Sequence, residues 1–139
     1  MKKVLFGLLS LTLIVATSCK KSKDAPALTK ENLAGQWGLD KVTFKYASSE
    51  QDVTSAWVDD CEKDDIVTLK VDFTYDSHDA GVECTGDYSG TWGLPAAQKF
   101  ELDGDQYDVT TWDGSTLGIS QAYDFGGNNG TIIMYMKKK

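Results

Sequence analysis

The chain has 139 residues, of which 14 are basic, all of them lysine, and 21 are acidic, so its formal net charge at pH 7 is −7. A protein that reads nucleic acid or phosphate needs a basic face and usually arginine side chains. The composition therefore excludes nucleic-acid binding, and the length suits one domain with a modest core.

The first 18 residues have the pattern of a secretory signal peptide. Lys2 and Lys3 form a positive start, and the apolar run that follows, residues 4–16, is too short to span a bilayer as a stable helix. Small residues of the kind that signal peptidases recognise occupy positions 16–18. We therefore predict that residues 1–18 are a signal peptide and that the mature chain is exported.

Cys19 follows the small residues directly and is one of only three cysteines, so one cysteine must lack a disulfide partner within the chain. The stretch VATSCKK around it resembles the lipobox of bacterial lipoproteins, although Ala16 stands where lipoboxes favour leucine. The resemblance implies that Cys19 becomes the N-terminus and carries a diacylglyceryl thioether and a further acyl chain such as palmitate. Two or more acyl chains anchor a protein stably to a membrane. A plain signal peptide, with Cys19 as an incidental thiol, is the alternative.

The residue after Cys19 indicates which membrane holds the protein. Lys20 stands where, by the same resemblance, an aspartate would favour retention at the inner membrane. We therefore expect a lipid-anchored protein of the cell envelope, at the outer membrane. The residues do not indicate whether it faces the periplasm or the cell surface. Residues 19–32 are charged and contain Pro26, which predicts a lipidated tether, and residues 33–139 are expected to form the domain.

The domain consists of short β-rich runs separated by turn residues at intervals of about 8–12 residues. Apolar residues in the first run, 36–46, change parity near Asp40, which predicts a β-bulge. In the run 66–76 every second residue is apolar or aromatic, which predicts one continuous strand. Residues 47–60 form a long connection between these runs, in which we expect a short helix.

Hairpin signals follow in the second half of the domain. Residues 88–94 predict a further strand. Asp103-Gly104 and Asp113-Gly114 each lie between alternating apolar residues, and such dipeptides predict tight hairpins. Residues 124–130 are rich in glycine and asparagine and predict a loop, and residues 131–139 predict the closing strand.

These runs give an all-β domain of about seven or eight strands in an up-and-down order. A long antiparallel meander leaves two unpaired edges, and curling the sheet until its first and last strands pair removes both edges. We therefore predict an up-and-down antiparallel β-barrel. The interior of a barrel of this size is either filled by side chains or wide enough for one small ligand.

Cys61 and Cys84 are expected to form a disulfide. They are the cysteines left after Cys19, and an exported protein lies in a compartment where disulfides persist. The bond would close a loop of about 24 residues and contribute about 3.5 kcal/mol in the chain-entropy model. A zinc site is the competing interpretation, but the only histidine is His78 and no CxxC pair is present. We predict no metal and no cofactor.

The order of the motifs resembles a known family. Gly35-Gln36-Trp37 is similar to the G-x-W signature of lipocalins, in which the tryptophan packs across the closed end of the barrel. The stretch CEKDDIVTLKVDFTYD, then Cys84, then SGTWGL resembles the lipocalin-like domain lipoproteins of Gram-negative bacteria. The resemblance implies a barrel that binds a small molecule, and it supplies no catalytic residues. Phe73 replaces the glycine of a turn in that family, so here the strand is expected to run on.

Aromatic residues on alternating strand positions are the candidate ligand contacts. If the barrel is open at one end, they would line an apolar cup in which tyrosine hydroxyls act as polar contacts. We predict that the protein is a monomer that binds a small apolar or amphiphilic molecule without catalysis. The predicted ligand contacts are Phe44, Tyr75, Tyr88 and Trp92. Trp37 is assigned to the structure alone. The competing interpretation is that all these rings fill the core.

Residues 59–65, which include five acidic side chains, allow other interpretations. These acidic residues can contact a basic envelope protein such as lysozyme. The alternative function is therefore an acidic protein-interaction module that acts as an inhibitor or docking partner. A calcium site and a solvated turn are also compatible with them, although the spacing is not that of an EF-hand. His78 lies between Ser77 and Asp79, and adjacent residues on a loop cannot adopt the geometry of a catalytic triad, so no enzyme is predicted.

The lipid anchor gives the first testable prediction. The substitution Cys19→Ser removes the thiol that acylation requires, so nearly all of the protein should leave the membrane fraction. Cell fractionation followed by immunoblotting measures this distribution. Ser22→Ala, which leaves Cys19 intact, is the control and should stay with the membrane. Unchanged membrane association of the Cys19 variant would contradict the anchor.

Overall fold

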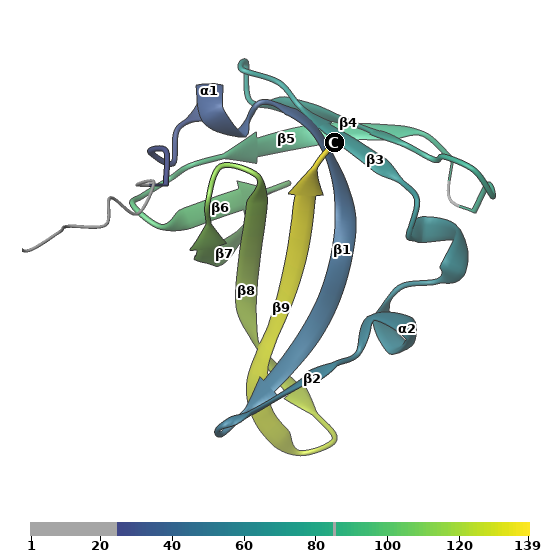
Figure 1. The fold of residues 1–139 in the computed structure, drawn as a ribbon, viewed down its shortest axis with the longest axis vertical. Coiled ribbons are helices and arrows are strands. Elements are labelled where there is room, and N and C mark those ends of the chain that lie inside the picture. Colours follow the sequence, from purple (N-terminus) through teal and green to yellow (C-terminus); the bar gives the residue numbers. More distant parts are fainter. Residues whose placement is uncertain (1–24, 85) are drawn as a thin grey trace, which may run out of the picture.

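The computed structural model describes residues 25–84 and 86–139, so the predicted signal peptide and Cys19 lie outside the described residues. Within the described residues, nine strands form one antiparallel sheet in the order β2-β1-β3-β4-β5-β6-β7-β8-β9. β1 pairs with β9 as well, which closes eight of these strands into a barrel and leaves β2 as an additional strand (Figure 1). The predicted all-β, up-and-down barrel is therefore confirmed.

In chain order the elements are α1 (Lys30–Leu33), β1 (Gly35–Tyr46), β2 (Ser49–Asp52), α2 (Thr54–Trp57), the 3-10 helix η1 (Asp60–Glu62), β3 (Ile66–Leu69), β4 (Thr74–His78), β5 (Tyr88–Gly93), β6 (Lys99–Leu102), β7 (Asp105–Trp112), β8 (Thr116–Phe125) and β9 (Asn128–Lys138). The long connection does hold the expected short helix, α2, and it also holds β2, which was not predicted. In the part of the chain that the structure describes, no helix has the length and apolar character needed to cross a membrane.

β1, β8 and β9 are the longest strands, and together with β2 they form the lower end of the barrel in Figure 1. The register between β1 and β9 shifts between Leu39 and Lys41, which confirms the predicted bulge near Asp40. An extra residue reverses the parity of a strand. The bulge therefore lets Val42, like Leu39, lie beside an apolar residue of β9 on the inner face of the barrel.

The prediction of one continuous strand over residues 66–76 is wrong. The run is a hairpin of β3 and β4, in which Leu69 pairs with Tyr75. The backbone N–H of Phe73 donates to the Lys70 carbonyl at 3.1 Å, and the Asp72 carboxylate accepts the N–H of Thr74 at 3.0 Å. A turn of this length keeps the odd-numbered residues of both strands on the same face. The alternation of apolar residues in the sequence therefore continues across the turn and gives no sign of it.

Phe73 adopts the backbone conformation that a glycine would adopt most easily at this turn, with φ of 67°. Its ring lies 5.2 Å from the ring of Trp92 and 5.4 Å from the ammonium group of Lys30. These contacts offset part of the cost of the left-handed backbone. The chain therefore keeps a turn where the family resemblance has one, although the glycine is absent.

The other turns follow their sequence signals more closely. Leu102 pairs with Asp105 across Asp103-Gly104, and Trp112 pairs with Leu117 around Asp113-Gly114, so both predicted hairpins are confirmed. The predicted loop over residues 124–130 is wrong in its extent. Gly126 and Gly127, both with positive φ, form a two-residue turn, and the strands on either side continue to it.

Trp37 and its neighbours close one end of the barrel. The Trp37 side chain is fully buried, and its Nε1–H donates to the Leu33 carbonyl at 2.8 Å. Helix α1 covers this end (Figure 1), and the buried Leu33 at its C-terminal end belongs to the core. Residues 25–32, which the sequence analysis placed in the tether, lie against the barrel here, because Trp112 donates to the Pro26 carbonyl at 2.6 Å and Leu28 packs on the core.

Gly90 lies at a tight approach between side chains in the wall of the barrel. It pairs with Tyr75, whose hydroxyl donates to Oδ2 of Asp103 at 2.6 Å, while Oδ1 of Asp103 accepts the N–H of Thr91 at 2.9 Å. A Cβ atom at position 90 would overlap Oδ1 of Asp103 and lie 2.7 Å from Cε1 of Tyr75. The hydrogen bonds that join β4, β5 and the β6–β7 turn therefore require glycine here.

Replacing Gly90 should destabilise the barrel. In Gly90→Ala the new methyl group would displace the Tyr75 ring or the Asp103 carboxylate, and we expect the free energy of unfolding to fall by about 1–3 kcal/mol. Gly93→Ala in the same strand is the matched control, because the nearest side-chain atom to its added Cβ lies at 3.9 Å. Urea denaturation compares the two variants. Equal losses would show that crowding at Gly90 is not the cause.

Candidate functional site

The half of the barrel opposite α1 contains two cavities, which share Met134 as a lining residue, and the larger one extends to Trp37. The first, here called the acidic chamber, has a volume of about 330 Å³, and its apolar lining includes Leu39, Val58, Val67, Met134 and Met136. The second, here called the apolar chamber, has a volume of about 120 Å³, and its lining includes Val42, Trp57, Leu102, Tyr107, Ile119 and Ile132. The side chains therefore fill only part of the barrel interior.

Exposure of inward-facing residues shows that this half is open to solvent. Tyr88 and Met134 line the chambers, yet they are 52% and 39% exposed, and Tyr123, which contacts Trp57, is 39% exposed. A close-packed protein interior would bury side chains of this size. Trp37, with no exposed surface, shows the contrast at the closed end.

The segment with α2 covers part of the opening. Thr54, its first residue, is held to β1 because its Oγ1 accepts the N–H of Val42 at 2.8 Å. Trp57, at the end of the helix, lines the apolar chamber and meets Tyr123 edge to face, with 4.7 Å between ring centroids. Val58, the next residue, lines the acidic chamber. One short segment thus contributes to both chambers.

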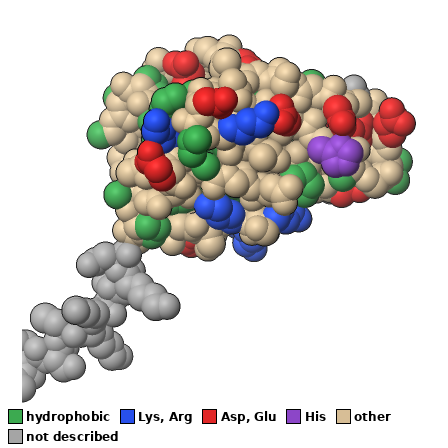
Figure 2. All heavy atoms as spheres, turned by 90° about the horizontal axis from the view of Figure 1, so that it is seen from above, with side chains coloured by type: hydrophobic (Ala, Val, Ile, Leu, Met, Phe, Trp, Pro, Cys, Tyr) green, Lys and Arg blue, Asp and Glu red, His purple; other side chains and the backbone are tan. Residues whose placement is uncertain are grey.

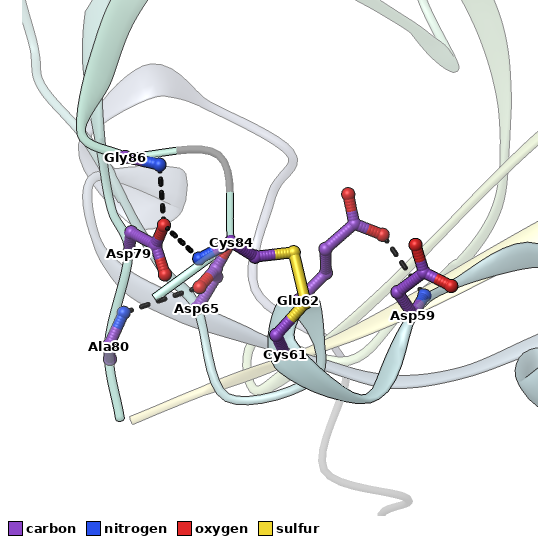
Figure 3. The surroundings of a disulfide bond; sticks show 8 residues. All are labelled: Asp59, Cys61, Glu62, Asp65, Asp79, Ala80, Cys84 and Gly86. Atoms are coloured by element: carbon purple, nitrogen blue, oxygen red, sulfur yellow. Dashed lines mark hydrogen bonds between the residues drawn. A yellow bond between two sulfur atoms is a disulfide. The ribbon is translucent and has the colours of Figure 1, made fainter. Parts of the chain in front are cut away.

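A disulfide holds the next part of this segment, as predicted. Cys61 in η1 is bonded to Cys84 in the loop after β4, with 5.6 Å between their Cα atoms (Figure 3). Asp59 and Glu62 form a capping box around η1, in which the Asp59 N–H donates to Oε2 of Glu62 at 3.1 Å. The bond and the cap fix the position of the residues on either side of Cys61.

Two carboxylates of this segment, those of Glu62 and Asp65, line the acidic chamber. Burial raises the pKa of Asp65, and the negative charges of Asp79, Asp64 and Glu62 raise it further. The N–H of Ala80, which donates to Oδ1 of Asp65 at 3.3 Å, opposes part of that increase in pKa. The acidic chamber is therefore a mostly apolar space with a negative side.

The structure separates the four predicted ligand residues. Tyr75 and Trp92 belong to the packed core, where Trp92 Nε1–H lies 3.0 Å from the carbonyls of Lys70 and Thr74. Phe44 lines a different hollow, of about 270 Å³, near the β1–β2 hairpin. Only Tyr88 lines one of the two chambers. A ligand-binding role for the four residues remains a prediction.

Sequence reasoning missed most of the residues that line the chambers. Met134 and Met136 alternate on β9 with the outward-facing Tyr135, so their period of two would have placed them inside the barrel. Trp57 lies in the long connection of residues 47–60, for which only a short helix was predicted. For Glu62 and Asp65 no signal in the sequence says which carboxylates of the acidic segment turn inward, because that depends on how the segment folds over the opening.

The structure places His78 and Ser77 on opposite faces of β4, and the described acidic residues form no group that could hold a metal ion. His78 ends β4 with its side chain exposed and 2.9 Å from Oδ1 of Asp87, whereas Ser77 is buried on the opposite face of the strand. Figure 2 shows several acidic side chains near the histidine at one end of this face. Within residues 25–84 and 86–139, no three side chains of His, Cys, Asp or Glu are grouped so that they could hold a metal ion.

Comparison of the chain with protein-family models, with curated proteins and with solved structures gives no significant match.

The raised pKa of Asp65 leads to a prediction about stability. The folded chain binds a proton to Asp65 more readily than the unfolded chain does, so this group contributes less stability as pH rises above its ordinary pKa of 3.8. Asp65→Asn cannot ionise, and its side-chain oxygen can still accept the N–H of Ala80. We expect the substitution to increase the free energy of unfolding at neutral pH by up to about 0.5 kcal/mol.

The gain should disappear well below pH 3.8, where the wild-type carboxyl is protonated in both the folded and the unfolded chain. Urea denaturation at the two pH values measures it. Asp105→Asn, at an exposed position outside both chambers, is the control. A gain of equal size at both pH values would rule out the charge of Asp65 as its cause.

Proposed function

We propose that the protein is a lipid-anchored, lipocalin-like protein of the cell envelope that binds a small apolar or amphiphilic molecule in its barrel and does not catalyse a reaction. The observation that carries this proposal is the unfilled half of the barrel. Two adjoining chambers lie there, and inward-facing side chains such as Tyr88 and Met134 remain exposed. Sites for small molecules are concave, mostly apolar and supplied with a few polar groups.

The affinity would come from removing apolar surface from water. Burial of about 200 Å² of apolar ligand surface contributes about 5 kcal/mol, before the cost of association is subtracted. The chambers also offer polar groups that can orient a ligand, among them the side chains of Tyr88, Tyr107 and Gln121. Each lies on a strand of the barrel wall, so the site is built on rigid elements.

The family and location in this proposal rest on the sequence motifs. The lipobox-like residues around Cys19 support an anchor at the outer membrane. The position of Trp37 supports the lipocalin-like assignment, because the tryptophan lies across the closed end of the barrel, where the G-x-W resemblance places it.

The acidic segment supports a second candidate, a module that contacts a basic envelope protein. Asp59, Asp60 and Asp64 are exposed, whereas Glu62 and Asp65 line the acidic chamber. A contact made by the exposed carboxylates would weaken sharply as salt is added, because salt screens exposed charges. Burial of an apolar ligand would not weaken in this way.

Native mass spectrometry of the full chain, purified from the envelope of cells that naturally make it, tests the proposed function. We expect a fraction of the protein to carry a non-covalent small molecule that collisional activation releases. Met134→Trp would fill the space that the chambers share and should reduce the occupied fraction about tenfold. Tyr135→Trp, an aromatic exchange at the next residue, which lines neither chamber, is the matched control.

An empty barrel in repeated preparations, with no displacement of a hydrophobic dye, would contradict the proposal. A basic protein that is retained at low salt and lost at high salt, with no small molecule present, would instead favour the second candidate.

A further inference from the structure

We propose that the ligand is a cationic amphiphile, a molecule with an ammonium head group and a short alkyl or single-ring tail. This inference rests on the proposed binding function and names the chemistry of the ligand. The head group would lie in the acidic chamber, beside Glu62 and Asp65, and the tail would extend past Met134 into the apolar chamber.

The charge of the acidic chamber has one sign. Glu62 and Asp65 are its ionisable carboxylates, and no lysine lines it. Among the described residues, no lysine forms a salt bridge with either carboxylate. Figure 3 shows both side chains beside the disulfide, each with one oxygen occupied, by the N–H of Asp59 or of Ala80. The second oxygen of each makes no hydrogen bond within the described chain and can accept one from an ammonium group.

Desolvation makes a cation the favoured neighbour of Asp65. Partial burial and the nearby negative charges of Asp79 and Asp64 destabilise its ionised form. A buried charge is tolerated best when an opposite charge compensates it. An ammonium group in the chamber would supply that compensation, whereas a carboxylate ligand would add a further negative charge to the same space.

Apolar surface on the remaining sides of the chamber suits the rest of the head group. Leu39, Val67 and Met136 can contact methyl or methylene groups on the cation. Tyr88, whose ring meets that of Tyr75 edge to face at 6.1 Å, offers an aromatic surface to a cation. The lining therefore favours an alkylated amine over a hydrated metal ion, which would need several oxygen ligands.

Met134 determines whether a ligand can use both chambers. It lines both, and its unbranched side chain can adopt several conformations without a large cost in packing. The apolar chamber, at about 120 Å³, is close to the size of cavity that holds a single ring. Trp57 of α2 forms part of its wall, so a tail there would be covered by the short helix.

Three probes with the same alkyl chain test the inference, namely hexyltrimethylammonium, hexanol and hexanoate. Isothermal titration calorimetry would measure their binding to the full chain in lipid nanodiscs, with empty nanodiscs as the blank. We expect the ammonium probe to bind about tenfold more tightly than hexanol, and hexanoate to bind most weakly. Equal affinities, or a preference for hexanoate, would overturn the inference.

The double substitution Glu62→Gln with Asp65→Asn should remove the preference for the ammonium probe, a loss of about tenfold, and leave the binding of hexanol unchanged. Both replacements keep the oxygen that accepts the N–H of Asp59 or Ala80. The matched control is Glu31→Gln with Asp105→Asn, which removes the same charge from exposed positions outside the chambers. If the control loses the preference to the same extent, net charge and not the chamber is responsible, and the inference fails.

The outcomes separate this inference from the proposed function. Binding of hexanol without a preference for the ammonium probe would keep a binding barrel and reject a cationic ligand. Binding of none of the three probes would count against the barrel as a site for small molecules and would reject both proposals.

Discussion

The pairing of β1 with β9 is the constraint on which the rest of the structure depends. Its register runs from Trp37 opposite Lys138 to Lys45 opposite Thr131, and it joins segments from opposite ends of the domain. Without this pairing the sheet would have two open edges, which are prone to pair with other chains. With this pairing, the inward-facing residues of eight strands surround one interior. Side chains can then pack densely at one end of that interior and leave space at the other.

That difference in filling connects the fold to the proposed function. At one end Trp37, Phe100 and Leu117 are almost completely buried, and Leu33 of α1 belongs to the same core cluster. The rest of the interior is less filled, and methionine and small polar side chains such as Ser77 face inward there and line the acidic chamber. The same barrel wall thus supports a packed core, which stabilises the fold, and an unfilled half, which leaves apolar surface for a ligand to cover.

The sequence predicted the features that depend on local patterns. The parity change near Asp40 and the Asp103-Gly104 turn both follow from residues close together in the chain, and both are present. The turn at Phe73 was missed because its length preserves the alternation on either side. The candidate site was predicted less well, since large aromatic residues were chosen. Tyr75 and Trp92 pack into the core for the same reason that made them candidates, their large apolar surface.

The residues that give the open half its chemistry belong to the segment between β2 and β3, and their positions depend on tertiary structure. The capping box at Asp59 and the disulfide of Cys61 turn Glu62 and Asp65 toward the interior, while Asp60 and Asp64 face solvent. One acidic segment therefore presents carboxylates both to the acidic chamber and to solvent. Structural disulfides form and persist mainly in oxidising compartments. The bond beside the acidic chamber is therefore compatible with the export that the first residues predict.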